Sequence, residues 1–208
     1  MNGTEIDGGL RGELLELGTS TLYEASGCDC DLPPYLHATW PGAKICGPAF
    51  PLTAGAYDNL PLHLALEMVR SGEVLVVDAG GVAAGYWGEV LTLAAVRAGV
   101  AGLVIDGGVR DRDALERHGF GVFSRWVSVH RTAKSDPGRM GEAVSIGGVT
   151  IRRGDVVVAD ADGVVVLPAA RLNEILEQAR QRRDAETGYF DRIAAGESTV
   201  DIYGFRRA

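Results

Sequence analysis

Two short apolar runs, each ending in an aspartate followed by glycines, constrain the fold of this 208-residue chain more than any other feature. The first run occupies residues 73–78 and the second occupies residues 101–106, with a helical pattern over residues 88–98 between them. Almost wholly apolar strands are typical of parallel strands that are covered on both faces. The stretch therefore predicts a β-α-β unit, which general topology makes right-handed.

Glycine-rich segments follow both predicted strands, and we expect them to be loops at the same edge of the sheet. The first loop, residues 80–88, leads to Glu89 at the start of the predicted helix. The second loop delivers Arg110 and Asp111 side by side. Because adjacent parallel strands end at the same edge, these groups should lie close together. Such a set suits a small anion held together with a divalent cation.

Each of these features also has a purely structural interpretation. Glycines are common in plain strand-to-helix turns, and an acid such as Glu89 in a first helical turn simply favours the helix dipole. On spacing alone, the structural interpretation is the stronger one for the glycine-rich segment and for Glu89. Arg110 offers a planar fork that matches a carboxylate, and Asp111 offers the hard oxygen that Mg²⁺ prefers. The same pair could be a surface ion pair at a helix start, so the sequence leaves both interpretations open.

Other catalytic motifs are absent from the sequence. None of the four histidines has the spacing of a zinc hydrolase, and no G-x-S-x-G elbow is present. Neither a dinucleotide fingerprint nor a phosphate-binding lysine loop follows the first strand. Neither of the two lysines, Lys44 and Lys134, sits at the end of a strong strand. A metal-dependent mechanism is therefore favoured over a Schiff-base mechanism.

Charge and cysteine content narrow the partners and the compartment. The net charge of −8 and the presence of only two lysines argue against nucleic acid. No apolar run reaches the length of a membrane span, so we expect no membrane partner. Three cysteines and an N-terminus without a secretion pattern favour a reducing cytoplasm. Cys28 and Cys30 could bind a soft metal, but without a second pair we expect buried or loop thiols.

The remaining patterns predict one domain over residues 1–208, with no repeat or linker. Gly47-Pro48 should break its strand or displace it to an edge, and Gly188 should break the last helix. The other expected elements are helices over residues 9–17, 19–25 and 60–71, a strand over 44–50, a helix over 113–118, a β-rich stretch over 123–151, a hairpin around 161–163, and a last helix from 168 to 186.

At these residues the sequence resembles the RraA-like family, which includes class II pyruvate aldolases acting on 4-hydroxy-4-methyl-2-oxoglutarate and 4-carboxy-4-hydroxy-2-oxoadipate. The aldolase members carry an acidic residue, then twenty residues, then Arg-Asp. Glu89 and Arg110-Asp111 meet that spacing, with glutamate where aspartate is usual. The resemblance covers nearly the whole chain, through Asp58-Asn59, G-E-V-L-V-V-D-A-G-G, A-G-V-A-G-L-V-I-D-G-G-V-R-D, G-V-T-I-R-R-G-D and D-A-D-G-V-V-V-L-P.

The resemblance implies a fold and a set of roles. The fold is an α/β single-domain sandwich of the αββα type (swivelling β/β/α), with a central mixed sheet flanked by helices. Asp111 would bind Mg²⁺ or Mn²⁺, and Arg110 would hold the pyruvyl carboxylate and stabilise enolate charge. Glu89 would orient a water on the metal for proton transfer. The other end of the pyruvyl group would be held by backbone amides of Gly88, Glu89, Val90 and Leu91.

The implied site is shared between subunits, because a glutamate from the neighbouring C-terminal helix completes it. Glu186 is the best match, although Glu174 and Glu177 lie nearby in the sequence. The resemblance therefore implies a homotrimer or a dimer of trimers.

The implied activity is divalent-metal-dependent cleavage of a 4-hydroxy-2-oxo dicarboxylic or tricarboxylic acid to pyruvate through a metal-stabilised enolate. Oxaloacetate decarboxylation would form the same enolate, so it is an expected side activity. The partner is then a small 2-oxo acid. The alternative is a non-catalytic RraA-like regulator that binds a ribonuclease or another protein. The regulator of this kind lacks the acid at the position of Glu89, so keeping Glu89, Arg110 and Asp111 favours the enzyme.

Overall fold

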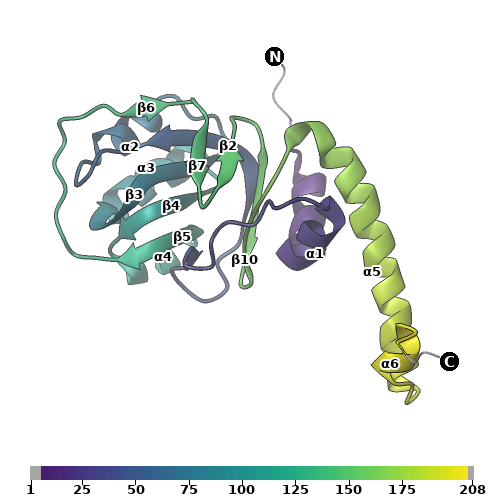
Figure 1. Cartoon of the computed structure of the whole chain (residues 1–208). Helices are drawn as coiled ribbons and strands as arrows, with labels where there is room; N and C mark the ends of the chain where they lie inside the picture. Colours follow the sequence, from purple (N-terminus) through teal and green to yellow (C-terminus); the bar gives the residue numbers. More distant parts are fainter. Residues whose placement is uncertain (1–5, 206–208) are drawn as a thin grey trace.

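The computed structural model describes residues 6–205 of the chain (Figure 1). Residues 1–5 and 206–208 lie outside the described part, and with them most of the N-terminal segment that lacks a secretion pattern. The strands are β1 (His37–Ala38), β2 (Ile45–Thr53), β3 (Val74–Trp87), β4 (Gly102–Val109), β5 (Val122–Val127), β6 (Arg139–Met140), β7 (Val144–Ile146), β8 (Val149–Ile151), β9 (Val156–Asp160) and β10 (Gly163–Leu167). The helices are α1 (Gly8–Ser26), α2 (Leu60–Ala65), α3 (Glu89–Ala98), α4 (Arg112–Arg117), the 3₁₀ turn η1 (Ala169–Arg171), α5 (Leu172–Ala194) and α6 (Thr199–Ile202).

A mixed sheet in the order β1-β5-β4-β3-β2-β9-β10 forms the centre of the molecule, and β6 pairs with β2 beside this path. Strands β2, β3, β4 and β5 run parallel to one another, whereas the remaining pairs are antiparallel. Strands β7 and β8 form a second, two-stranded sheet. The predicted mixed sheet flanked by helices is thus confirmed.

Alternating side chains of the sheet enter different cores, which explains the apolar runs. In β3, Leu75 and Val77 pack with buried residues of α2, α3 and α4. Val74 and Val76 enter a second core on the other face, built with β7, β8 and the irregular residues 32–43. A third core joins β9 and β10 to α1 and α5. A strand covered on both faces has no place for polar side chains, so the two runs are necessarily apolar.

The predicted β-α-β unit is present as β3, α3 and β4, but its glycine-rich segments are not loops. Strand β3 continues to Trp87, and β4 continues to Val109. Register shifts between the two strands after Asp78 absorb the extra residues of β3 as bulges. A Cβ on Gly108 would lie 2.4 Å from the carbonyl oxygen of Ala84. Gly108 therefore serves close contact between strand backbones, which the expectation of loops missed.

Strand β2 occupies the middle of the sheet, and the prediction of a break or an edge at Gly47-Pro48 is wrong. Residues Ile45–Pro48 pair with β9, and residues Ala49–Thr53 pair with β3. The proline thus stands where β2 passes from one neighbour to the other. Its missing N–H costs little at a point where the ladder changes partner.

The N-terminal helix has the predicted kink, with a different cap. Gly18 adopts φ 77° and ψ 160°, which splits α1 into two segments. The first amide of the second segment is satisfied by Asp160 of β9, which accepts the N–H of Thr19 at 2.9 Å and its hydroxyl at 2.6 Å. Thr19 or Ser20 would be the cap expected from the local sequence, but a carboxylate from a distant strand takes that place.

Two other helices end away from their predicted limits. Helix α2 stops at Ala65 instead of reaching Gly72, and the N–H of Arg70 donates to the Glu73 carboxylate at 2.7 Å. Helix α5 continues through Gly188 to Ala194, so the predicted break is absent. A glycine in a helix interior costs only about 1 kcal/mol relative to alanine, which the neighbouring turns can offset.

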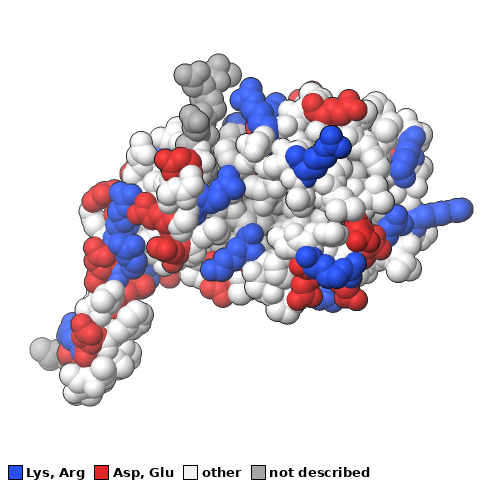
Figure 2. Space-filling model, turned by 180° about the vertical axis from the view of Figure 1, so that it is seen from behind, with Lys and Arg blue, Asp and Glu red and all other residues white. Residues whose placement is uncertain are grey.

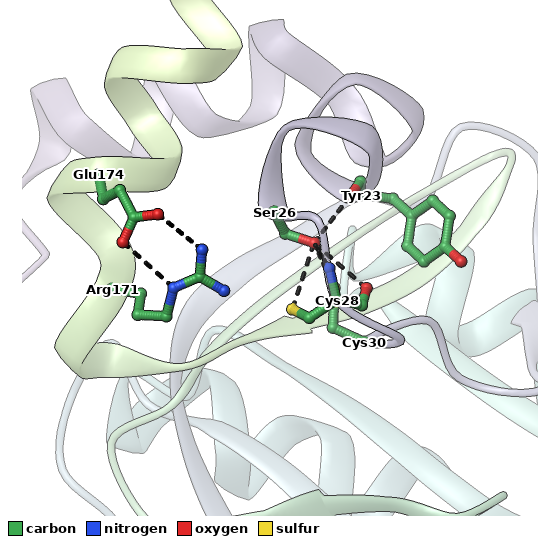
Figure 3. A network of polar contacts seen from close by, with 6 residues as sticks. All are labelled: Tyr23, Ser26, Cys28, Cys30, Arg171 and Glu174. Carbon is green, nitrogen blue, oxygen red and sulfur yellow. Dashed lines mark hydrogen bonds and ion pairs between the residues drawn. The ribbon is translucent and has the colours of Figure 1, made fainter.

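Helix α5 leaves the body of the molecule and carries α6 at its far end (Figure 1). Its first half packs against α1, where Arg180 forms a two-pronged ion pair with Glu13 at 2.6 and 2.8 Å. Near its start, Arg171 forms a similar pair with Glu174 (Figure 3). The Arg180 pair joins α5 to α1, whereas the Arg171 pair lies within the start of α5 itself. The third core attaches α5 to β9 and β10.

The end of α1 is fixed beside that junction by a thiol pair (Figure 3). The hydroxyl oxygen of Ser26 lies 3.3 Å from the sulfur atoms of both Cys28 and Cys30. Burial raises the pKa of the Cys30 thiol to about 11, so this thiol stays protonated. Within residues 6–205 no group of three or more histidine, cysteine or acidic side chains could hold a metal ion. In this structure both thiols contact the Ser26 hydroxyl.

The segment before α2 is held by the buried side chain of Asp58. One carboxylate oxygen accepts the N–H of Leu60 at 3.0 Å. The other accepts the N–H of Ser135 at 2.8 Å, its hydroxyl at 2.6 Å and the N–H of Asp136 at 3.1 Å. Burial alone would raise the pKa of Asp58, but these hydrogen bonds lower it to about 2.

We expect Asp58 to make the free energy of unfolding depend on pH in the acid range. Because its pKa is about 2 in the folded chain and about 3.9 when unfolded, its contribution is complete above about pH 4 and is lost as the pH falls towards 2. Asp58→Asn should lower stability by about 2 kcal/mol at neutral pH, because four donors then face a neutral amide in place of a carboxylate. Urea unfolding of both proteins across this range measures the difference, and parallel pH profiles would contradict the assignment.

Candidate active site

The ends of β3 and β4 bring the two segments singled out in the sequence into contact. One residue separates β3 from α3, and two residues separate β4 from α4. The backbone N–H of Glu89 donates to the Asp111 carboxylate at 3.0 Å, and the N–H of Arg110 donates to the carbonyl of Trp87 at 2.8 Å. Glu89, Arg110 and Asp111 therefore lie together at one edge of the sheet.

Asp111 has an unusual backbone that aims its side chain at α3. Its φ of 58° lies in the left-handed region, where Tyr57 is the other non-glycine residue in the described part of the chain. The Nε atom of Arg110 lies 3.8 Å from Oδ2 of Asp111. Both side chains remain about half exposed, at 48% and 44% respectively. A strained aspartate beside an accessible guanidinium is a typical arrangement at a binding site.

The glycine before α3 is required by this arrangement. A Cβ on Gly88 would lie 2.4 Å from Oδ2 of Asp111, and 3.1 and 3.2 Å from the Cγ and Nε atoms of Arg110. Gly85 meets the same arginine, because its Cβ would lie 3.1 Å from Cδ of Arg110. The missing side chains of Gly85 and Gly88 therefore leave room for Arg110 and Asp111 to lie close to the backbone.

The amides at the start of α3 are only partly available to a ligand. The N–H of Glu89 is occupied by Asp111. The N–H groups of Val90 and Leu91 belong to the first helical turn, where no carbonyl lies four residues earlier in the helix. The side chain of Val90 is 77% exposed, whereas that of Leu91 is buried in the core. Anchored by Leu91, the helix presents these amides at a fixed place beside Arg110.

The carboxylate of Glu89 turns to the far end of α4, a contact that the sequence did not predict. Its Oε1 atom lies 3.1 Å from Nε2 of His118 and 3.4 Å from Nη2 of Arg117. His118 follows Asp111 by seven residues, which is about two helical turns. Asp111 and His118 therefore stand at the two ends of α4. No sequence motif marks the contact of His118 with Glu89, because it depends on α3 lying beside α4.

Glu186 does not join this group within its own chain. It lies on α5, which packs on α1 and on the β9–β10 side of the sheet, away from α3 and α4 (Figure 1). There Oε1 of Glu186 lies 3.1 Å from Arg182, which also pairs with Glu24. Glu174 and Glu177, the alternatives, lie closer to the start of the same helix, and Glu174 is paired with Arg171. The structure thus separates this part of the predicted site from the rest.

The donor set at the sheet edge suits a hydrated hard cation. Mg²⁺ usually keeps several waters and takes only one or two carboxylates, and Mn²⁺ prefers oxygen ligands as well. Asp111 supplies one exposed carboxylate, and the Glu89 segment lies against it. The contacts of Asp111 with the Glu89 amide and with Arg110 fall on a single oxygen, Oδ2. The residues present therefore fit a metal held by Asp111.

Comparison with known proteins identifies the family. The family model described as "RraA-like: Aldolase/RraA" matches residues 19–166, which is well over half of the chain. The chain belongs to the RraA-like family. A protein of Halalkalibacterium halodurans, provisionally named a 4-hydroxy-4-methyl-2-oxoglutarate aldolase, is 33% identical over 67% of this chain and 67% of its own length. Such relatives support an aldolase-type function for this RraA-like protein.

Solved structures agree with the fold. An uncharacterised protein from Pseudomonas syringae superposes with a TM-score of 0.87 at 27% identity, covering 99% of this chain and 98% of its own. Streptomyces coelicolor RraAS2, described as an unusual member of the RNase ES inhibitor RraA protein family, gives 0.79 at 31% identity over 90% of this chain and its whole length. Among residues 6–205 no helix is both long and apolar enough to span a membrane.

Proposed function

We propose that this RraA-like protein is a divalent-metal-dependent aldolase that releases pyruvate from a 4-hydroxy-2-oxo dicarboxylic or tricarboxylic acid. We also propose that it decarboxylates oxaloacetate at the same site. The contact between the Glu89 segment and Asp111, beside Arg110, is the observation that carries the proposal. It unites an acid, a guanidinium and a cation ligand at one accessible edge. The provisional aldolase names of relatives support the same reaction class.

The chemistry divides among these residues as follows. Asp111 would hold Mg²⁺ or Mn²⁺, which when bound stabilises negative charge on the pyruvyl oxygens as a Lewis acid. Arg110 donates to the pyruvyl carboxylate through its planar fork, and the amides of Val90 and Leu91 add fixed donors. As the C3–C4 bond breaks, Glu89 accepts the proton of the 4-hydroxyl group through a water. The proton then returns to C3, which becomes the methyl group of pyruvate.

The proposal includes a second subunit, arranged as a homotrimer or a dimer of trimers, that supplies Glu186. Its own chain carries Glu186 away from Arg110, so another copy would have to bring it. Beside the site, α3 exposes Val90, Leu93 and Val96 at 77%, 51% and 49%. An apolar row of this kind favours burial against another chain.

The protruding α5–α6 arm also has the character of a contact surface. Acidic and basic side chains are intermixed along its upper part, while its far end is mostly uncharged (Figure 2). That end exposes several large apolar side chains, namely those of Phe190, Ile193, Val200, Tyr203 and Phe205. An arm that carries Glu186 and ends in apolar groups is suited to lie on a neighbouring subunit.

We expect the purified protein to release pyruvate from oxaloacetate only when Mg²⁺ or Mn²⁺ is present. EDTA should abolish the activity, and added metal should restore it, because Asp111 is the main protein ligand proposed for the cation. Pyruvate formation is followed by coupling to lactate dehydrogenase. The control is the same metal without protein, since metal ions alone promote this decarboxylation. A metal-replete protein that turned over neither oxaloacetate nor any 4-hydroxy-2-oxo diacid would rule out the enzyme.

The second candidate is a non-catalytic regulator that binds a ribonuclease or another protein. The likeness to RraAS2, whose description names an RNase inhibitor family, favours it. The two candidates differ at Glu89, because the regulator of this kind is expected to lack an acid there. An inactive, metal-replete protein that inhibited a ribonuclease would support the regulator.

A further inference from the structure

We propose that His118 is a positioning residue that fixes the carboxylate of Glu89 for proton transfer. The inference rests on the proposed aldolase function and extends it to a residue outside the Glu89 and Arg110-Asp111 pattern. Its basis is the contact between His118 Nε2 and Glu89 Oε1 at 3.1 Å, formed across two helices.

His118 is itself firmly placed at the end of α4. Its backbone N–H donates to the carbonyl of Ala114 at 3.0 Å, and its side chain is only 28% exposed. The chain then turns at Gly119 and buries Phe120, whose ring stacks on that of Trp87 at 5.8 Å. The buried aromatic residue thus anchors the backbone next to His118, and the contact with Glu89 holds the imidazole against α3.

The two ends of α4 hold one residue of α3 at two points. At the start, Asp111 accepts the backbone N–H of Glu89. At the end, the side chain of His118 meets the carboxylate of the same residue. This double contact fixes both the backbone and the side chain of Glu89, so its rotamers are restricted before substrate arrives. Restricting a general base in this way removes entropy that catalysis would otherwise have to supply.

The contact also accounts for a glutamate at a position where aspartate is usual in the aldolases. An aspartate at residue 89 would be one carbon–carbon bond shorter, about 1.5 Å, and would not reach a partner now 3.1 Å away. The contacts of His118 and Arg117 both fall on Oε1, which leaves Oε2 to face a water. Glu89 and His118 thus act as a matched pair.

Arg117 is the other group that faces the Glu89 carboxylate from α4. It lies farther away, at 3.4 Å, and its side chain is 62% exposed. An exposed pair of this kind is screened by solvent and contributes little. His118 is therefore the contact expected to fix the geometry, and Arg117→Ala should have the smaller effect.

The test measures exchange of the methyl protons of pyruvate with heavy water by NMR, in protein loaded with Mn²⁺ or Mg²⁺. This reaction reports proton transfer without carbon–carbon cleavage. His118→Ala should slow exchange roughly tenfold and leave the concentration of pyruvate for half-maximal rate unchanged, because misplacing a base affects turnover. His118→Gln, which keeps a donor at a similar reach, should recover most of the rate. His37→Ala, an exposed histidine on β1, is the matched control.

A double-mutant cycle separates positioning from a general structural effect. Glu89→Asp should slow exchange on its own, and adding His118→Ala to it should cause no further loss, because aspartate cannot reach the imidazole. In metal-free protein, the imidazole nitrogen NMR signals of His118 should show a protonated Nε2 and should shift in Glu89→Gln.

The outcomes are distinguishable. If the wild-type protein neither exchanges nor turns over substrate, the proposed function and this inference both fall. If the wild type exchanges and His118→Ala does so at the same rate, only this inference falls. The inference about His118 is also wrong if His118→Ala slows exchange by the same factor in the Glu89→Asp variant as in the wild type. A purely structural role of His118 would slow exchange in both proteins.

Discussion

Asp111→Asn is expected to abolish metal-dependent pyruvate release while preserving the fold. Asparagine tolerates the left-handed backbone that φ 58° requires, which most other residues do not. Its side-chain oxygen can still accept the N–H of Glu89. The substitution therefore removes one negative charge and little else. Mutation of a residue that only supports a metal ligand typically lowers metal affinity or activity by about 10- to 100-fold. We therefore expect loss of the ligand itself to lower kcat/KM by about a hundredfold or more.

The measurement is activity as a function of metal concentration, together with the thermal unfolding midpoint. Activity should require far more metal or disappear, and the midpoint should stay near the wild-type value. Asp113→Asn is the matched control, because Asp113 is an exposed acid in the first turn of the same helix. If Asp111→Asn and Asp113→Asn behaved alike, Asp111 would not be the metal ligand.

The sheet-edge part of the site follows from local sequence and one topological rule. Apolar runs identify β3 and β4, and a helix between them makes their parallel pairing the natural outcome. Residues just beyond the two strands must then meet, as Glu89 and Asp111 do. The chemical assignment of Arg110 and Asp111 came from the family resemblance, since the residues alone allowed a surface ion pair.

Two of the wrong predictions share a physical cause, which is that the pairing partner lies far away in the sequence. Gly80 to Gly88 looks like a loop until β4 pairs with it. Pro48 looks like an edge residue until β2 is seen to change neighbours there. Gly188 is a different case, because the helix continues through it to Ala194 although a Cβ there would meet nothing within 4 Å. Local propensity is about 1 kcal/mol per residue, and tertiary pairing overrides it.

Local sequence also does not reveal the contacts of His118 and Glu186. His118 has no motif, and its meaning depends on α3 lying beside α4. Glu186 was assigned from the resemblance, and its own chain places it on an arm that leads away from the sheet edge (Figure 1). One chain is therefore enough to form the Glu89–Asp111–Arg110 edge. The contribution that we propose for Glu186 depends on assembly, which sequence periodicity does not encode.

We expect two inactive variants, Asp111→Asn and Glu186→Gln, to restore activity when their subunits are mixed. In a head-to-tail ring, each site takes Asp111 from one copy and Glu186 from the next, so the two defects can fall on different sites. Random mixing in equal amounts would leave about a quarter of sites with both native residues, and hence about a quarter of wild-type activity. Glu186→Gln should fold normally, because its ion pair with Arg182 is partly exposed.

The experiment unfolds the two variants together in urea, refolds them, and measures oxaloacetate decarboxylation against each variant refolded alone. Recovery of activity requires that Asp111 and Glu186 of one site come from different chains, because neither variant chain contains both native residues. Mixing Asp111→Asn with Arg110→Ala is the matched control and should give no recovery, since those two residues serve a site from the same chain. If the Asp111→Asn and Glu186→Gln mixture recovered no activity, or if Glu186→Gln were fully active alone, Glu186 would not complete a neighbouring site, and the arm formed by α5 would serve assembly alone. Equal recovery in the Asp111→Asn and Arg110→Ala control would mean that the recovery does not report a site shared in this way.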